Sequence, residues 1–270
     1  MAVDSSGAVL VHGGMCTSCC WDPVMEHLTI PATAVDLPGR GQRPADLFSV
    51  TLDDCVSAVV GAADQQGWDR FTLVGHSLGG VTITETAWRH PDRVARLIYV
   101  GALIPAPGQS GCMLAYGVDW PVDQLVTIDE GIARTMFGND LSDGEWRTWW
   151  PRFVPEAPGL INAHLSGYPS GIPTTYIALA DDVAVPPALW DQMIGRIGAD
   201  TVTRKQISAG HMAMYSKPKE LADLISERFA ADEPAQVTAL GASETFTNRT
   251  SGRAGTASAR NQRNARFPLG

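Results

Sequence analysis

The pentapeptide Gly75-His76-Ser77-Leu78-Gly79 places a serine between two glycines at a strand-to-helix junction. A β-branched and apolar run, residues 71–74, precedes it, and a helical pattern follows. In a G-x-S-x-G turn the strained backbone exposes the serine hydroxyl. The glycines are needed because a side chain two residues before or after the serine would clash with neighbouring segments. We therefore predict that Ser77 is a catalytic nucleophile. The backbone N–H of Leu78 is predicted to stabilise a developing oxyanion.

A serine hydroxyl is a weak nucleophile and needs a base that is held by an acid. With this type of turn the chain order is serine, carboxylate, histidine. Asp181 and Asp182 follow one predicted strand, and His211 follows the next. Such strand ends lie at the ligand-binding edge of an open α/β sheet. We predict His211 as the general base and Asp182 as the acid, with Asp181 as second choice, because Asp182 stands four residues before Pro186.

The loop after the first predicted strand reads His12-Gly13-Gly14-Met15. An HGG-type loop offers a backbone N–H to the oxyanion in hydrolases with a G-x-S-x-G turn. We predict that the N–H of Gly14, or that of Met15, acts with the N–H of Leu78. The residues predicted to contact substrate are Gly13, Met15, His76, Met212, Trp120 and Trp149.

Short apolar runs alternate with helical patterns, which is typical of a mostly parallel sheet covered by helices on both faces. This fold class is α/β, with six strands. The predicted strands are residues 8–12, 32–36, 71–75, 94–101, 174–180 and 202–207, and the main helices are residues 52–66, 79–89, 187–197 and 217–230.

Residues 103–173 separate two predicted strands by far more than an ordinary βα loop. They are rich in tryptophan, phenylalanine and methionine, so we predict a helical cap inserted between the two parts of the core, residues 1–102 and 174–232. Residues 233–270 are dominated by small and polar side chains towards the C-terminus, and we predict that they form a disordered tail.

The 270-residue chain is 44% hydrophobic and 18% charged, and its net charge is −9. An acidic surface repels phosphate backbones, so nucleic acid is an unfavourable partner. No apolar run is long enough to span a membrane. The first ten residues lack a basic region followed by a long apolar one, so we expect a cytoplasmic protein with reduced cysteines. The oligomeric state is open, with a homodimer as one option.

The sequence indicates neither a cofactor nor a metal. Cys16, Cys19 and Cys20 form a C-x-x-C-C cluster, but the sequence has no second ligand pair to complete a tetrahedral zinc site. We therefore interpret these cysteines as small side chains that pack in an apolar environment. No glycine-rich phosphate-binding motif occurs.

Together these motifs resemble the α/β-hydrolase superfamily over residues 8–230. The run from Gly210 to Pro218, Trp21 after the first loop, and Leu189-Trp190 after the acid loop resemble the branch of plant methyl-ester esterases and hydroxynitrile lyases. In that branch the lyases carry a lysine after the catalytic histidine and a threonine in the first loop. This chain has Met212 and Gly13 there, so the resemblance implies an esterase.

The predicted function is a serine hydrolase that cleaves a small to medium, partly apolar carboxylic ester through an acyl-enzyme. A thioesterase or a lactone-forming or lactone-opening enzyme of a biosynthetic pathway would use the same residues. A ligand-binding receptor of this fold with vestigial activity is an alternative of another class, because fold alone does not fix function. A hydroxynitrile lyase is less favoured.

Overall fold

The computed structural model describes residues 6–198 and 201–230, and these contain one six-stranded sheet with the order β2-β1-β3-β4-β5-β6. Every neighbouring pair of strands is parallel. The predicted strands differ from the observed ones by at most one residue, always at the carboxyl end, where the chain leaves the ladder. The strands are β1 (Ala8–Val11), β2 (Ala32–Val35), β3 (Phe71–His76), β4 (Val94–Val100), β5 (Thr174–Leu179) and β6 (Val202–Ile207).

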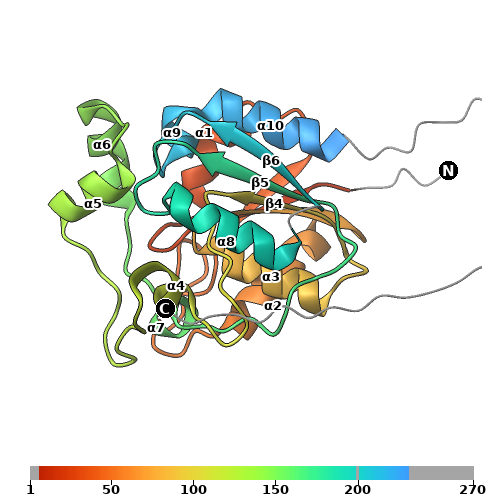
Figure 1. The fold of residues 1–270 in the computed structure, drawn as a ribbon, viewed down its shortest axis with the longest axis horizontal. Coiled ribbons are helices and arrows are strands. Elements are labelled where there is room, and N and C mark those ends of the chain that lie inside the picture. Colours follow the sequence, from red (N-terminus) through yellow and green to blue (C-terminus); the bar gives the residue numbers. More distant parts are fainter. Residues whose placement is uncertain (1–5, 199–200, 231–270) are drawn as a thin grey trace, which may run out of the picture. The chain divides into compact units, whose positions relative to one another are not determined.

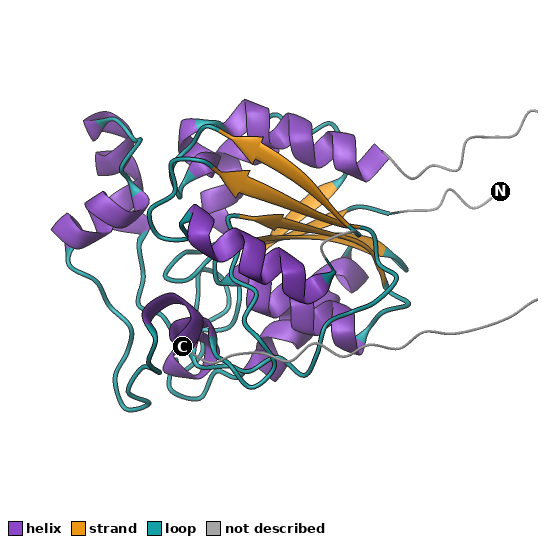
Figure 2. Cartoon of the chain, viewed as in Figure 1, coloured by secondary structure: helices purple, strands orange, loops and turns teal. Residues whose placement is uncertain are grey.

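Helices cover both faces of this sheet (Figures 1 and 2). On one face lie α2 (Leu52–Gln65), α3 (Gly79–Arg89) and α8 (Pro187–Ile197); on the other lie α1 (Asp22–Met25), α9 (Ala213–Ser216) and α10 (Pro218–Ala230). The predicted α/β-hydrolase architecture is thereby confirmed. The short helices α1 and α9 were not predicted, because four residues are too few to show a helical period. No helix in the described ranges is long and apolar enough to cross a bilayer.

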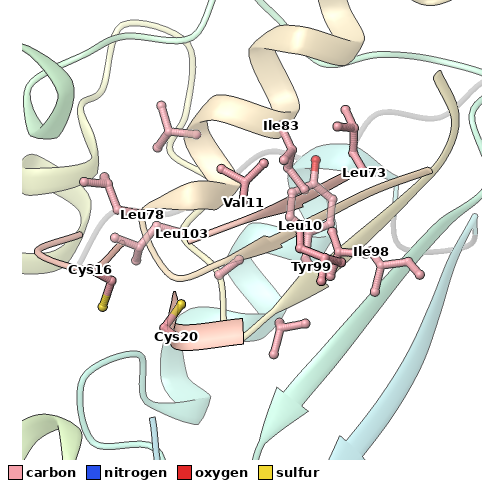
Figure 3. Close-up of a cluster of buried hydrophobic side chains, with 14 of the residues drawn as sticks. Leu10, Val11, Cys16, Cys20, Leu73, Leu78, Ile83, Ile98, Tyr99 and Leu103 are labelled. Carbon is pink, nitrogen blue, oxygen red and sulfur yellow. The ribbon is translucent and has the colours of Figure 1, made fainter. Parts of the chain in front are cut away.

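The core of the protein lies between the central strands and their covering helices. All residues of β1 and β3 are buried, as expected for strands with helices on both faces. Figure 3 shows Leu10 of β1, Leu73 of β3, Ile98 and Tyr99 of β4 and Ile83 of α3 gathered in this core. The core fixes the central strands, and with them the loops at their carboxyl ends.

Residues 103–173 contain four short α-helices, and α5 and α6 lie beyond the carboxyl ends of the strands (Figure 1). Each of the first three helices begins at a polar capping residue: Ser110, Asp129 or Ser142. These helices are α4 (Gly111–Tyr116), α5 (Glu130–Phe137), α6 (Asp143–Trp149) and α7 (Pro158–Ile161). We refer to residues 103–173 as the cap. The predicted tail, residues 233–270, lies outside the described residues.

Candidate active site

The turn between β3 and α3 has the geometry of a nucleophile elbow. Ser77 has φ +50°, in the left-handed region that residues other than glycine rarely adopt. A Cβ atom on Gly75 would lie 2.8 Å from Ile83 Cδ1 and 2.9 Å from the carbonyl oxygen of Gly79. A Cβ atom on Gly79 would lie 2.7 Å from the carbonyl oxygen of His12. Both glycines are therefore required for the close approach of strand, turn and helix.

The structure brings Ser77, His211 and Asp182 into one hydrogen-bonded chain. His211 Nε2 lies 3.0 Å from Ser77 Oγ, and His211 Nδ1 lies 2.8 Å from Asp182 Oδ2. The other carboxylate oxygen, Asp182 Oδ1, accepts the N–H groups of Ala184 at 2.8 Å and Val185 at 2.9 Å. His211 and Asp182 are each only 3% exposed. This arrangement can move a proton from the serine hydroxyl to the imidazole while the carboxylate holds the ring.

Asp181, the second choice for the acid, is placed differently. Its side chain is exposed, and only its backbone is engaged: its N–H donates to the carbonyl of Ala209 at 3.0 Å, and its carbonyl accepts from Asn139 Nδ2 at 2.8 Å. The geometry thus separates two adjacent aspartates that the sequence left as alternatives. Asp182 faces His211, and Asp181 fixes the loop.

The loop after β1 is held by the buried side chain of His12. Its Nδ1–H donates to the carbonyl of Gly13 at 2.8 Å, and its Nε2 accepts the N–H of Leu37 at 3.2 Å. The N–H of Met15 donates to Glu156 Oε2 at 3.1 Å. Within the described ranges, the N–H groups of Gly14 and Leu78 have no such partner. Of the three N–H groups predicted as oxyanion donors, those of Gly14 and Leu78 are therefore unengaged, and that of Met15 is not.

Burial, with the nearby Arg40 guanidinium, lowers the pKa of His12 from 6.5 to about 4. The unfolded chain therefore binds a proton between these pH values that the folded chain excludes, so stability rises with pH. We expect His12 to remove about 3 kcal/mol of unfolding free energy as the pH falls from 6.5 to 4.

Urea unfolding at several pH values between 4 and 7 measures this loss of unfolding free energy. His12→Gln should be less stable at pH 7 and show a shallower pH slope, whereas the same substitution at the exposed His27 should leave the slope unchanged. Equal slopes in all three proteins would contradict the prediction.

His76 lies beside the proposed base, His211, and its pKa is lowered like that of His12. Its Nε2–H donates to the carbonyl oxygen of His211 at 3.0 Å, and the two ring centroids are 4.6 Å apart. Burial, with the neighbouring His211, holds the pKa of His76 well below its usual value. His76 is thus a neutral ring that supports the backbone of His211, in addition to lining the pocket as predicted.

A mostly apolar pocket opens at Ser77. Of the predicted substrate contacts, Met15, His76 and Met212 line it. Gly13 does not, although its Cα faces Ser77 closely: a Cβ there would lie 2.9 Å from Ser77 Cβ. The cap contributes a further set of lining residues: Leu103, Gly111, Ala115, Tyr116, Phe137, Phe153, Glu156 and Ile161.

Trp120 and Trp149, which are also predicted to contact substrate, do not line this pocket. Trp149 is 2% exposed, and its ring packs at 5.1 Å from that of Phe153, which does line it. The indole N–H of Trp120 donates to the carbonyl of Gln124 at 3.0 Å within the cap. Trp149 belongs to the core of the cap, and Trp120 is half-buried against that core. The apolar character of a tryptophan alone could not distinguish these positions from a pocket wall.

The three cysteines of the first loop are free thiols. Cys16 lines the pocket, whereas Cys20 is 2% exposed and does not line it. Figure 3 shows both side chains in the cluster of buried apolar residues. Burial raises the pKa of Cys20 well above its usual value, which keeps the thiol neutral.

Three contacts that cap residues make at the site were not predicted from the sequence, although Phe137 is one of the aromatic cap residues that suggested an apolar substrate. The ring of Phe137 packs on that of His211 with centroids 5.2 Å apart. Asp140 Oδ2 accepts the N–H of Gly210 at 2.6 Å, next to His211. Glu156 is a buried carboxylate inside the pocket wall. Only Glu156 carried a signal in the sequence, as a charge within the apolar run at residues 153–161.

Comparison with known proteins agrees with this geometry. A pyrethroid hydrolase from Sphingobium wenxiniae is 29% identical over 255 residues, which cover 84% of this chain and 88% of that protein. Methylesterase 7 from Arabidopsis thaliana is 28% identical over 252 residues, which cover 81% and 94%. The crystal structure of a pyrethroid hydrolase from Sphingobium faniae matches with a TM-score of 0.70 at 25% identity, covering 84% and 99%. Residues 8–224 match the alpha/beta hydrolase family, and the chain therefore belongs to that family.

Proposed function

We propose that this protein hydrolyses carboxylic esters of small to medium, partly apolar molecules through an acyl-enzyme on Ser77. The observation that carries the proposal is the continuous chain from Ser77 Oγ through His211 to the buried carboxylate of Asp182. The reaction class, serine ester hydrolysis, agrees with the relatives, which include a pyrethroid hydrolase and a methylesterase.

In the first half of the reaction, Ser77 Oγ attacks the ester carbonyl carbon as its proton passes to His211 Nε2. Asp182 accepts the Nδ1–H bond and stabilises the imidazolium. The carbonyl oxygen becomes an oxyanion, which receives hydrogen bonds from the N–H groups of Gly14 and Leu78. Collapse of this intermediate breaks the bond to the alcohol, which leaves with the proton from His211.

In the second half, water replaces the alcohol. His211 removes a proton from the water as its oxygen attacks the acyl carbon, and a second oxyanion forms at the same donors. Its collapse returns the proton to Ser77 Oγ and releases the carboxylic acid. The pathway uses one base, one acid and two backbone donors.

The pocket also bears on the lyase alternative. Met212, which follows His211, is 1% exposed and lines the pocket. Neither lysine nor arginine is among the residues that line this pocket. A departing cyanide would need a positive charge near the base, and a thioether supplies none. The lining therefore favours ester hydrolysis.

The apolar lining leads to an expected substrate preference. We expect kcat/KM for p-nitrophenyl esters to rise from acetate to medium-chain or aryl acyl groups, because each buried CH₂ contributes about 0.8 kcal/mol. Steady-state kinetics across the acyl series measure this preference, with the thioester and a lactone of the preferred acyl group alongside. A kcat/KM that falls from the acetate to the longer and aryl acyl groups would contradict it.

Two nearby valines provide a matched control. Val185 lines the pocket and is 2% exposed, whereas Val183 is 52% exposed and does not line it. Val185→Thr, a nearly isosteric change, should lower kcat/KM for the apolar esters by about tenfold, because it buries a hydroxyl against the substrate. Val183→Thr should leave kcat/KM unchanged.

A further inference from the structure

Met15, next to the proposed oxyanion donor Gly14, has a backbone that the cap holds from both sides. Its φ is +57°, in the left-handed region, although it carries a side chain. The N–H of Val154 donates to the carbonyl of Met15 at 2.9 Å, and the N–H of Met15 donates to Glu156 Oε2 at 3.1 Å. A strained conformation persists where surrounding contacts determine it, and here two cap residues supply those contacts.

Glu156 is itself fixed on every side. Its backbone exchanges two hydrogen bonds with that of Val126, at 2.9 and 3.0 Å. Its Oε1 accepts the N–H of Ala157 at 2.6 Å and forms an ion pair with Arg40, whose Nη1 donates to the carbonyl of Pro38 at 2.7 Å. Both charged side chains are almost completely buried. A carboxylate in an apolar wall is tolerated when it is paired in this way.

This carboxylate lies beside the proposed oxyanion hole. A Cβ atom on Gly14 would lie 3.6 Å from Glu156 Oε2 and 3.3 Å from Leu78 Cδ2. An unpaired negative charge at that position would oppose a developing oxyanion, and the Arg40 guanidinium offsets it. The mechanism proposed above uses neither Glu156 nor Arg40, yet Glu156 lies next to the donor Gly14, and Arg40 is paired with Glu156.

We propose that Glu156, neutralised by Arg40, is a positioning residue that fixes Met15 and thereby aims the N–H of Gly14 at the oxyanion. The cap thus completes the oxyanion hole from the far side of the pocket. This inference rests on the ester hydrolysis proposed above. It predicts that losing the acceptor for the Met15 N–H weakens transition-state binding and leaves ground-state binding unchanged.

The test compares two uncharged pairs, Arg40→Met/Glu156→Gln and Arg40→Met/Glu156→Leu. Neither pair buries an unpaired charge, and only the glutamine offers an oxygen to the N–H of Met15. In the leucine pair we expect kcat for the best ester to fall about 10²-fold with KM within about twofold of wild type. In the glutamine pair we expect a fall of about tenfold or less.

A second measurement separates positioning from general loosening of the fold. A trifluoromethyl ketone forms a hemiketal oxyanion on a catalytic serine, whereas the matching methyl ketone binds chiefly as a neutral ligand. We expect the inhibition constant of the former to rise in parallel with the loss of kcat/KM, and that of the latter to stay constant. Melting temperatures accompany both series. If the leucine pair does not fold, the single variant Glu156→Gln takes its place. Its one amide oxygen cannot accept hydrogen bonds from both Met15 and Arg40, as the two carboxylate oxygens of Glu156 do. A fall in kcat at constant KM is again expected.

Equal kcat values in the two pairs, or in the single variant and wild type, would overturn the inference. So would losses confined to KM or to the melting temperature. A wild-type protein that neither hydrolyses esters nor reacts with a fluorophosphonate would overturn the proposed function, and the inference with it. If the wild-type protein hydrolyses esters and the variants have the same kcat as wild type, only the inference is overturned.

Discussion

Ser77→Ala is expected to lower kcat for the best ester about 10⁵-fold or more, because the substitution removes the atom that forms the acyl-enzyme. His211→Ala should cost about as much, and the double variant hardly more than either single one, since residues that act in one proton-transfer step are not additive. About 10³-fold acceleration over water should remain, from the backbone donors and from binding.

The measurement is steady-state hydrolysis combined with intact mass after incubation with a fluorophosphonate. Wild type should gain the mass of a single adduct, and Ser77→Ala should gain none. Ser208→Ala is the matched control, because Ser208 is an exposed serine near the histidine loop and makes none of the contacts of the triad. An adduct on Ser77→Ala, or a loss of activity below tenfold, would show that another group is the nucleophile.

The positions of the strands along the chain could be predicted because parallel strands buried on both faces read as continuous apolar runs. The run at residues 8–11 and the run at residues 71–76 are buried along their whole length. The proposed nucleophile and acid follow from the same regularity, because Ser77 and Asp182 stand within three residues of the end of such a run. The proposed base, His211, follows β6, whose middle residues are polar and mostly exposed. Local sequence was sufficient here, since each residue's position depends on the strand that precedes it.

The contribution of the cap could not be predicted in this way. Phe137 on the ring of His211 and Asp140 on the N–H of Gly210 are contacts between segments about 70 residues apart. No periodic pattern encodes such pairs, because they depend on how the cap helices fold back over the sheet. The same limitation explains Trp149: a buried tryptophan of the cap core and one in the pocket wall look alike in sequence.

Asp182→Asn is expected to lower kcat about 10⁴-fold while leaving the fold nearly intact. The asparagine can still accept the N–H groups of Ala184 and Val185 through its oxygen, as the Asp182 Oδ1 atom does at 2.8 and 2.9 Å. Its amide nitrogen then faces His211 Nδ1, which must act as an acceptor. The proton moves to Nε2, and that nitrogen can no longer receive the proton of Ser77.

Asp181→Asn provides the control, because it makes the same chemical change one residue away. Its side chain is exposed and its backbone bonds are untouched by the substitution, so kcat should stay within about twofold of wild type, as is usual for a surface site. Rates and melting temperatures of both variants decide the matter together. A large loss in Asp181→Asn with normal turnover in Asp182→Asn would exchange their roles. Comparable large losses in both would mean that the negative charge of the whole loop, rather than the tautomer of His211, is what the reaction requires.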